Sequence, residues 1–224
     1  MSTTTRTRAP TSSEESSVYY FYYFLAIIPS IVLHEVSHGY VAYHYGDPTA
    51  KENGRLTLNP IAHIDLFGTI ILPAVLVFSG LPPIGYAKPV PVNVSRLRNP
   101  RSQSLYVSLA GPFVNIVLSA VAIGITEFAW NVLHSQGLTQ FGVDFGIINL
   151  FLAIFNLIPI PPLDGSAIIE RFVPRRKLAG YYQLRARALP IVMVLFLLNA
   201  VIFHFGYNEL NSISNWWFSL LRLR

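Results

Sequence analysis

The sequence contains no cysteine, and charged side chains make up only 12% of its 224 residues. Without cysteine there are neither disulfide bonds nor thiolate ligands, so any bound metal must be held by His, Asp and Glu. The sequence combines this sparse charge with 52% hydrophobic residues and a mean hydropathy of +0.46. Such a composition is not typical of a soluble domain of this length and indicates a membrane protein that crosses the bilayer several times.

The net charge of +5 comes from 16 basic and 11 acidic residues. A basic balance can indicate a nucleic-acid partner, but here Lys and Arg lie between the apolar stretches, as they do in cytoplasmic loops. Residues 81–103 carry four of them and residues 171–187 carry six, whereas residues 134–144 carry none. We therefore expect a lipid bilayer and no nucleic acid as partner, with 171–187 in the cytoplasm and 134–144 outside.

Five apolar stretches predict membrane segments, and two short stretches between them predict strands. Residues 54–60 alternate in polarity, and residues 84–94 are rich in β-branched side chains although Pro89 and Pro91 interrupt them. The predicted fold class is an all-α polytopic membrane protein with about five to six membrane helices or segments and a small membrane-associated β-hairpin or sheet. The apolar stretches cover residues 18–45, 66–80, 104–133, 145–160 and 189–205.

Both ends of the chain differ from its apolar middle. Residues 1–17 are polar and low in complexity, which predicts a disordered tail. Residues 207–224 combine Trp216, Trp217 and Phe218 with two arginines, which predicts an amphipathic segment lying in the membrane interface. Residues 18–206 between them form the predicted membrane domain.

The motif His34-Glu35-x-x-His38 directly follows residues 19–33, which carry no charge. On a helix the two histidines lie on one face about one turn apart, so both imidazoles can reach a single Zn²⁺. Glu35 between them can orient and deprotonate a water molecule. Ionisable groups are costly at membrane depth and are functional by default. The alternatives are a chance pentapeptide or a polar contact between helices.

A third ligand is found by elimination, because most of the eleven acidic residues lie in the tail or in loops. Asp164 follows the apolar stretch 145–160, in the sequence NLIPIPPLDG. Its three prolines cannot sit in a regular helix, and irregular backbone at membrane depth is tolerated only where protein buries it or a watery cavity adjoins it. Asp164 is therefore a candidate to complete a His, His, Asp site with water as the fourth ligand. The alternative is a proline-rich turn in which Asp164 caps the next helix.

These motifs resemble those of the site-2 protease family, which are intramembrane zinc metalloproteases of the peptidase M50 type. That family is marked by HExxH in one membrane helix and by N-x-x-P-x-x-x-L-D-G in another, matched here by residues 34–38 and 156–165. The sequences AGP at 110–112 and GYAK at 85–88 extend the similarity.

The resemblance implies specific roles for the residues that match. His34, His38 and Asp164 would bind one Zn²⁺, Glu35 would be the catalytic base, and residues 18–206 would be the intramembrane metalloprotease domain.

Further residues are expected near the substrate. The family's use of Asn156 implies contact with unwound substrate backbone, and Asn115, Gly85 and Tyr86 belong to the other matching motifs. His63 lies where the chain is expected to re-enter the membrane. It is either a residue at the margin of the site or a histidine that makes a structural hydrogen bond in its loop.

His34 and Asp164 can share one ion only if they reach the same depth in the membrane. Stretch 145–160 runs from outside to the cytoplasm by the distribution of positive charge, so Asp164 lies near its cytoplasmic end. Stretch 18–45 must then run the same way, and 66–80 should enter and leave on the cytoplasmic side. We expect a multi-pass protein of the cell membrane with its active site nearer the cytoplasmic side.

Together these features predict a zinc endopeptidase that cuts a membrane-embedded or membrane-proximal segment of another protein. A helical substrate must unwind to be cut, and the predicted strand at 84–94 could hold it extended by strand addition. Two other interpretations use the same ligands. A metal transporter would need further acidic or His sites along its helices, and a scaffold that does not cleave would have no need of Glu35. No oligomeric state is indicated.

Overall fold

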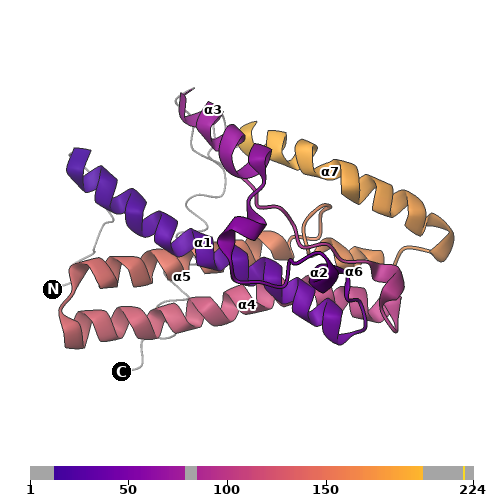
Figure 1. Cartoon of the computed structure of the whole chain (residues 1–224), viewed down its shortest axis with the longest axis horizontal. Coiled ribbons are helices and arrows are strands. Elements are labelled where there is room, and N and C mark those ends of the chain that lie inside the picture. The colour runs from indigo at the N-terminus through magenta and orange to yellow at the C-terminus, as the bar shows by residue number, and fades with distance from the viewer. Residues whose placement is uncertain (1–12, 79–84, 199–218, 220–224) are drawn as a thin grey trace.

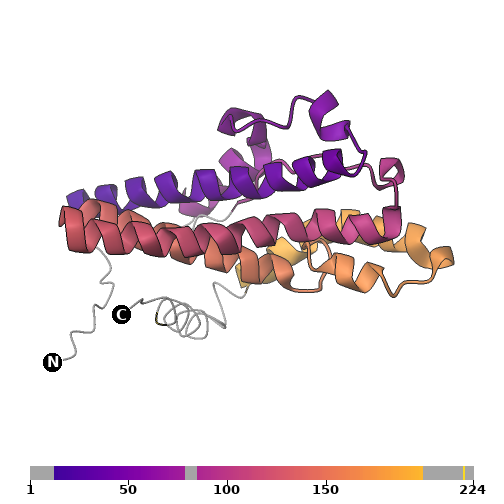
Figure 2. The same cartoon turned by 90° about the horizontal axis from the view of Figure 1, so that it is seen from below.

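Three long helices form the body of the structure, a computed structural model that describes residues 13–78, 85–198 and 219. They are α1 (Ser13–His44), α4 (Pro100–Phe128) and α5 (Gln136–Leu157), and they lie side by side (Figure 1, Figure 2). Each of the three contacts both of the others. The remaining elements are the helices α2 (Thr49–Glu52), α3 (Leu72–Phe78), α6 (Ser166–Glu170) and α7 (Leu178–Leu198), the 3₁₀ turns Pro60–His63, Val94–Arg96 and Arg175–Lys177, and the π-helical turns Leu66–Ile71 and Ala129–Leu133.

α1 and α5 run in one direction, and α4 runs in the opposite one. At one level Ala26 of α1 packs in a cluster with Ala122 of α4 and Phe145 of α5. Further along α1, His38 reaches the carbonyl of Val107, which lies earlier in α4. The described residues include three helices that are long and apolar enough to cross a membrane. They cover Phe24–His44, Pro100–Leu133 and Gln136–Leu157.

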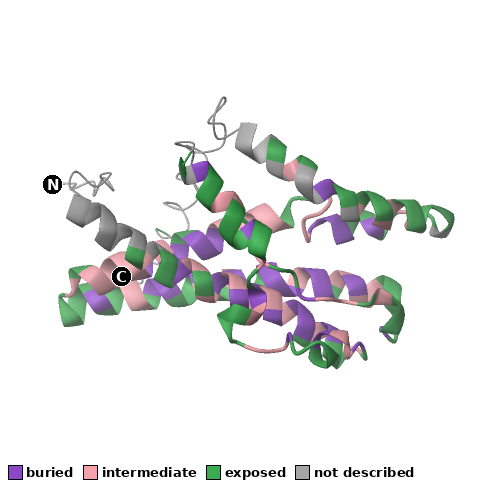
Figure 3. Ribbon diagram, turned by 45° about the horizontal axis from the view of Figure 1, so that its top comes forward, coloured by how far each residue is buried: buried purple, intermediate pink, exposed green. Residues whose placement is uncertain are grey.

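Polar side chains are among those buried inside this three-helix body, and large apolar side chains are exposed on its outside. Figure 3 shows where the buried and exposed residues lie along the ribbon. Ser30, Asn115, Ser119 and Asn149 are completely buried. Large apolar side chains are exposed on all three helices, among them Phe21, Phe24, Phe113, Val117, Val121 and Ile147. Such a surface suits lipid, in which buried polar contacts and close packing hold helices together.

The described residues contain fewer candidate spans than the five to six segments expected. Residues 66–78 form a π-helical turn and α3, a short apolar helix that points away from the three-helix body (Figure 1), and residues 79–80 of the predicted stretch lie outside the described part of the chain. α7 overlaps the start of the predicted segment 189–205, and residues 199–205 lie outside the described part of the chain. The all-helical class is confirmed, with three candidate spans.

The predicted strands at 54–60 and 84–94 do not form in the described residues, so that part of the prediction is wrong. Residues 85–93 are extended, but the N–H groups of Tyr86 and Lys88 donate to Gly68 O and His63 O, 3.1 and 2.9 Å away in helical turns, and pair with no strand among the described residues. The two prolines of this segment also have no N–H to offer to a ladder.

Residues 54–60 form turns and irregular backbone. The Arg55 N–H donates to Ala50 O at 2.8 Å and closes the turn after α2. The Arg55 guanidinium is buried and donates to Lys88 O at 2.6 Å. Arg55 thus holds segment 85–93 in place.

The ends of the helices also differ from the predicted limits. α1 begins at Ser13, inside the predicted tail 1–17, while residues 1–12 lie outside the described part, as does the predicted interfacial segment 207–224 apart from Ser219. α5 begins at Gln136, earlier than expected, because Ser135 Oγ accepts a hydrogen bond from Leu138 N at 3.4 Å and caps the helix.

Candidate metal centre

Three side chains from two distant parts of the chain meet where α1 faces the loop that follows α5. His34 Nε2 and His38 Nε2 of α1 lie 3.2 Å apart. Asp164 Oδ2 lies 3.1 Å from the first of these atoms and 3.3 Å from the second. Both imidazoles are buried. The structure thus brings together the three side chains that the sequence singled out as ligands.

The loop after α5 folds back to place Asp164. Gly165 N donates to Asn156 O at 2.6 Å and ties the loop to the end of α5. A Cβ at position 165 would lie 2.2 Å from Leu157 O, so this close approach requires glycine. No side chain caps α6, which starts directly after Gly165. The Asp164 side chain therefore does not have the capping role that the sequence left open.

The Nδ1 atom of each imidazole makes a hydrogen bond to an oxygen atom of α4. His38 Nδ1 donates to Val107 O at 2.7 Å, and His34 Nδ1 donates to Asn115 Oδ1. These oxygens only accept, so the proton of each neutral ring lies on Nδ1 and each Nε2 carries a lone pair. The two lone pairs face Asp164 Oδ2, a buried atom with no hydrogen-bond donor in the described part of the chain. Such a group of atoms is favourable only around a cation.

The donor set fits zinc. Tetrahedral ligands with bonds of about 2.0–2.1 Å lie about 3.3 Å apart, and the three pairs here are 3.1, 3.2 and 3.3 Å apart. Catalytic zinc sites use three protein ligands of this kind. The ionised carboxylate is the form that binds a metal.

Glu35 lies beside the ligands and faces the extended segment 85–93. Its Oε2 accepts a hydrogen bond from Val90 N at 2.9 Å. The segment is fixed on both sides of this contact by Arg55 and Asp47, which make hydrogen bonds of 2.6 Å to its backbone. The carboxylate therefore lies between the histidine face of α1 and a stretch of extended backbone.

Three further predicted site residues have structural partners. Asn115 is completely buried and holds His34. His63 is buried, and its Nε2 lies 2.9 Å from a carbonyl of its own loop, which favours the structural alternative for this histidine. Asn156 donates to a carbonyl one turn back in α5, at 3.0 Å.

Gly85 and Tyr86 lie where the extended segment crosses the π-helical turn Leu66–Ile71. A Cβ on Gly85 would lie 2.3 Å from Gly68 O, and a Cβ on Gly68 would lie 2.5 Å from the ring of Tyr86. The two glycines allow the crossing, and the crossing fixes the course of the segment toward Glu35.

Sequence reasoning missed two residues behind the site, Ser30 and Asn149. Asn149 Oδ1 accepts a hydrogen bond from Asn115 Nδ2 at 2.6 Å, and Asn149 Nδ2 donates to Ser30 Oγ at 2.7 Å. The signal was an amide side chain inside an apolar helix, where polar groups are expensive and have partners.

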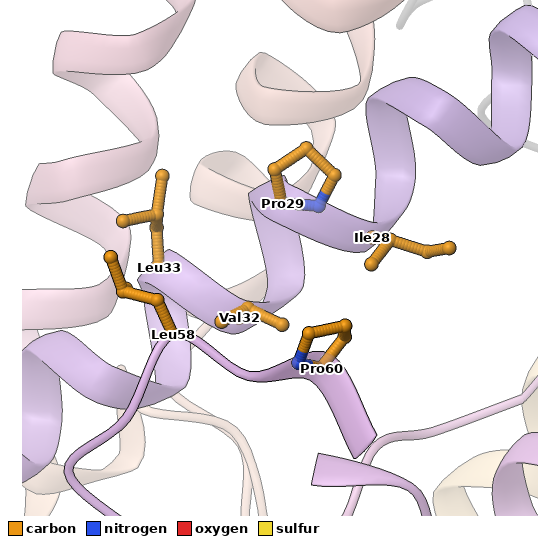
Figure 4. Close-up of a pocket in the computed structure, with 6 residues that line it drawn as sticks. All are labelled: Ile28, Pro29, Val32, Leu33, Leu58 and Pro60. Carbon is orange, nitrogen blue, oxygen red and sulfur yellow. The ribbon is translucent and has the colours of Figure 1, made fainter. Parts of the chain in front are cut away.

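An apolar cavity of about 300 Å³ lies along α1 just before the ligands (Figure 4). Ile28 and Val32 share the face of α1 that carries Glu35, because they precede it by seven and three positions. The cavity is lined by Ile28, Pro29, Val32 and Leu33 of α1 and by Leu58 and Pro60 of the loop that follows α2.

The chain is similar to known proteins over most of its length. The model of peptidase family M50 matches residues 122–199. Two relatives both carry "Putative zinc metalloprotease" names. YwhC of Bacillus subtilis (strain 168) is 40% identical over 182 residues, which cover 77% of this chain and 78% of that protein. Rip2 of Mycolicibacterium smegmatis is 32% identical over 142 residues, which cover 63% of this chain and 53% of that protein.

No solved structure shows a significant match to the chain. The family match to residues 122–199 includes Asp164, and the similarity to YwhC spans most of both proteins. Together with the His, His, Asp cluster, these similarities show that the chain belongs to the zinc metalloproteases of peptidase family M50.

Proposed function

We propose that this chain is an intramembrane endopeptidase that hydrolyses peptide bonds in or next to transmembrane segments of other membrane proteins. One observation carries the proposal. The cluster of His34, His38 and Asp164, with Glu35 beside it, is built on helices that are long and apolar enough to cross a membrane. A soluble substrate would have no reason to meet a site in that position.

His34, His38 and Asp164 would hold the zinc ion through the three atoms that face one another. Zinc, when bound, supplies Lewis acidity that polarises the scissile carbonyl and lowers the pKa of water. Glu35 would take the proton of the attacking water and pass it to the leaving amine. The active site would lie nearer the cytoplasmic side of the cell membrane, where positive charge gathers in residues 171–187.

The substrate would reach this site as an unwound chain. Segment 85–93 is extended and contacts Glu35, so it could hold a substrate strand beside the base, with Gly85 and Tyr86 shaping its course. Asn156, at the end of α5, accepts a hydrogen bond from Gly165 N on its backbone carbonyl, and its side chain could bind substrate backbone. The burial of Asn115 and His63 favours supporting roles for those two residues.

Replacing the proposed base tests the function. Glu35→Gln should retain zinc, because Glu35 is not among the ligands, and cleavage of a membrane-protein substrate by the purified chain in proteoliposomes should fall by about 10²–10⁴-fold. Glu127→Gln is the matched control, because Glu127 is exposed on α4 away from the cluster and should leave both quantities unchanged. Unchanged cleavage in Glu35→Gln would contradict the proposal, and zinc uptake into the vesicles would favour a transporter.

A further inference from the structure

A chain of hydrogen bonds runs from the protein interior to His34. Ser30, Asn115 and Asn149, which form it, are completely buried and come from α1, α4 and α5 respectively. Asn149 Nδ2 donates to Phe145 O at 2.8 Å and to Ser30 Oγ at 2.7 Å. Ser30 Oγ in turn donates its proton to Ala26 O at 2.8 Å.

These partners allow only one orientation of each amide. The Phe145 carbonyl can only accept, and Ser30 has already used its proton, so both require the NH₂ group of Asn149. The Asn149 oxygen then faces Asn115, at 2.6 Å, and the nearer group of Asn115 must be its NH₂. The Asn115 oxygen is left to face His34 Nδ1.

The orientation of Asn115 decides where the proton of His34 lies. An amide oxygen only accepts, so Nδ1 carries the proton and the lone pair lies on Nε2, toward His38 and Asp164. If Asn115 were reversed, its oxygen would face the Asn149 oxygen and its NH₂ would face His34 Nδ1. That arrangement favours the tautomer whose Nε2 is protonated and cannot bind a metal. In a buried site of low dielectric the repulsion between the two oxygens is not relieved by water.

The two histidines therefore differ in which group fixes their tautomer. His38 needs only the backbone carbonyl of Val107. His34 depends on the side-chain amide of Asn115, whose oxygen and nitrogen would exchange places on a rotation by half a turn. We propose that Asn149 is a positioning residue of the zinc site: by holding Asn115 in one orientation it fixes His34 in the tautomer that can bind metal. This inference rests on the proposed zinc-dependent function.

Zinc affinity of the purified full chain, measured by competition with a chromogenic chelator, tests the role without relying on cleavage. Asn149→Ala should weaken zinc binding by about 10- to 100-fold. Asn149→Asp should stay within about threefold of the unmodified chain, because a buried, protonated carboxyl can still donate to Phe145 O and accept from Asn115.

Should Asn149→Ala not fold, Asn149→Ser provides the same comparison. Serine can donate to Phe145 O as Ser30 donates to Ala26 O, and it is too short to hold Asn115. Ser119→Ala is the matched control, because Ser119 is equally buried on α4 and donates to Gly146 O at 3.0 Å, outside the chain of hydrogen bonds. It should change thermal stability alone.

The outcomes separate this inference from the function on which it rests. Zinc affinity that is unchanged in Asn149→Ala or Asn149→Ser would overturn the positioning role while leaving the protease intact. An equal loss in Asn149→Asp or in Ser119→Ala would also overturn it, because the effect would then be one of packing. Failure of the unmodified chain to bind zinc would refute the proposed function itself.

Discussion

At the scale of single residues, the positions of the two candidate histidine ligands depend on Gly111 of α4, where there is no room for a side chain. The backbone of α4 passes close to the Nε2 side of both imidazoles at Gly111. A Cβ there would lie 2.5 Å from His34 Cε1 and from His38 Nε2, closer than real carbon atoms approach. Gly111 thus fixes how near α4 comes to α1, and with it the distance from Asn115 to His34.

Gly111→Ala should displace one or both imidazoles and weaken zinc binding by about 10- to 100-fold. Gly124→Ala, on the same helix, is the matched control because a Cβ there meets nothing within 4 Å. In that variant alanine should leave zinc affinity unchanged and leave the helix no less stable. Zinc titration of both variants measures the difference. Equal affinities would mean that α4 can move away from α1 without disturbing the ligands.

The sequence allowed the clustering of the three candidate ligands to be predicted but not the residues that hold them. The spacing of His34 and His38 is a property of any helix, and Asp164 stood out because few acidic residues lie near membrane depth. The partnership of Asn149 with Asn115 joins two helices, so it depends on how those helices pack. No local pattern carries that information.

At the scale of elements, the extended segment 85–93 shows why a strand pattern alone was misleading. The β-branched residues do favour extended backbone. A strand, however, also needs a partner with matching donors and acceptors. Here Tyr86, Lys88 and Val90 donate to carbonyls of two helical turns and to Glu35. The segment is therefore held extended by these turns and by the proposed base.

A substrate bound by strand addition would have to use the donors that the protein leaves free. The N–H groups of Tyr86 and Lys88, on either side of Ala87, already make hydrogen bonds. The N–H of Ala87 makes none to the described residues. Ala87→Pro removes this donor without touching the zinc cluster. We expect a several-fold higher KM for a membrane substrate with unchanged zinc content.

Ala87→Ser is the control for this prediction, because it keeps the N–H and alters only the side chain. Val92 is a less suitable position, since its side chain packs on the cluster of Ala42, Leu97 and Val107. If KM were the same in Ala87→Pro and Ala87→Ser, substrate would not add to this segment as a strand.

At the scale of the whole molecule, the shared depth of His34 and Asp164 follows from the directions of the helices. α1 and α5 run the same way, so the end of each reaches one level, and α4 returns between them. Positive charge predicted the direction of α5, because charge bias acts on whole loops, and the need to share one ion gave α1 the same direction. Neither argument could place α3 and α7, whose positions depend on packing and lipid.

Labelling of single cysteines tests this topology, and the chain suits it because it has no native cysteine. Asn53→Cys and Ser95→Cys are both exposed and flank the segment 66–80, so both should react only from the cytoplasmic side. Gln136→Cys, exposed at the start of α5, should react only from outside. Labelling of Asn53 and Ser95 from opposite sides would show that 66–80 crosses the membrane.

Pro89 and Pro91 also bear on how copies of the chain meet in a crowded bilayer. Neighbouring N–H groups of an extended backbone point in opposite directions. Tyr86, Lys88 and Val90 donate toward the protein, so the outward side falls to Ala87 and the two prolines, which have no N–H. An unpaired edge rich in donors invites pairing with another chain, and proline at an edge removes such donors. Pro89 and Pro91 thereby leave Ala87 as the outward donor of residues 86–91, too few donors for two copies of this edge to pair along its length.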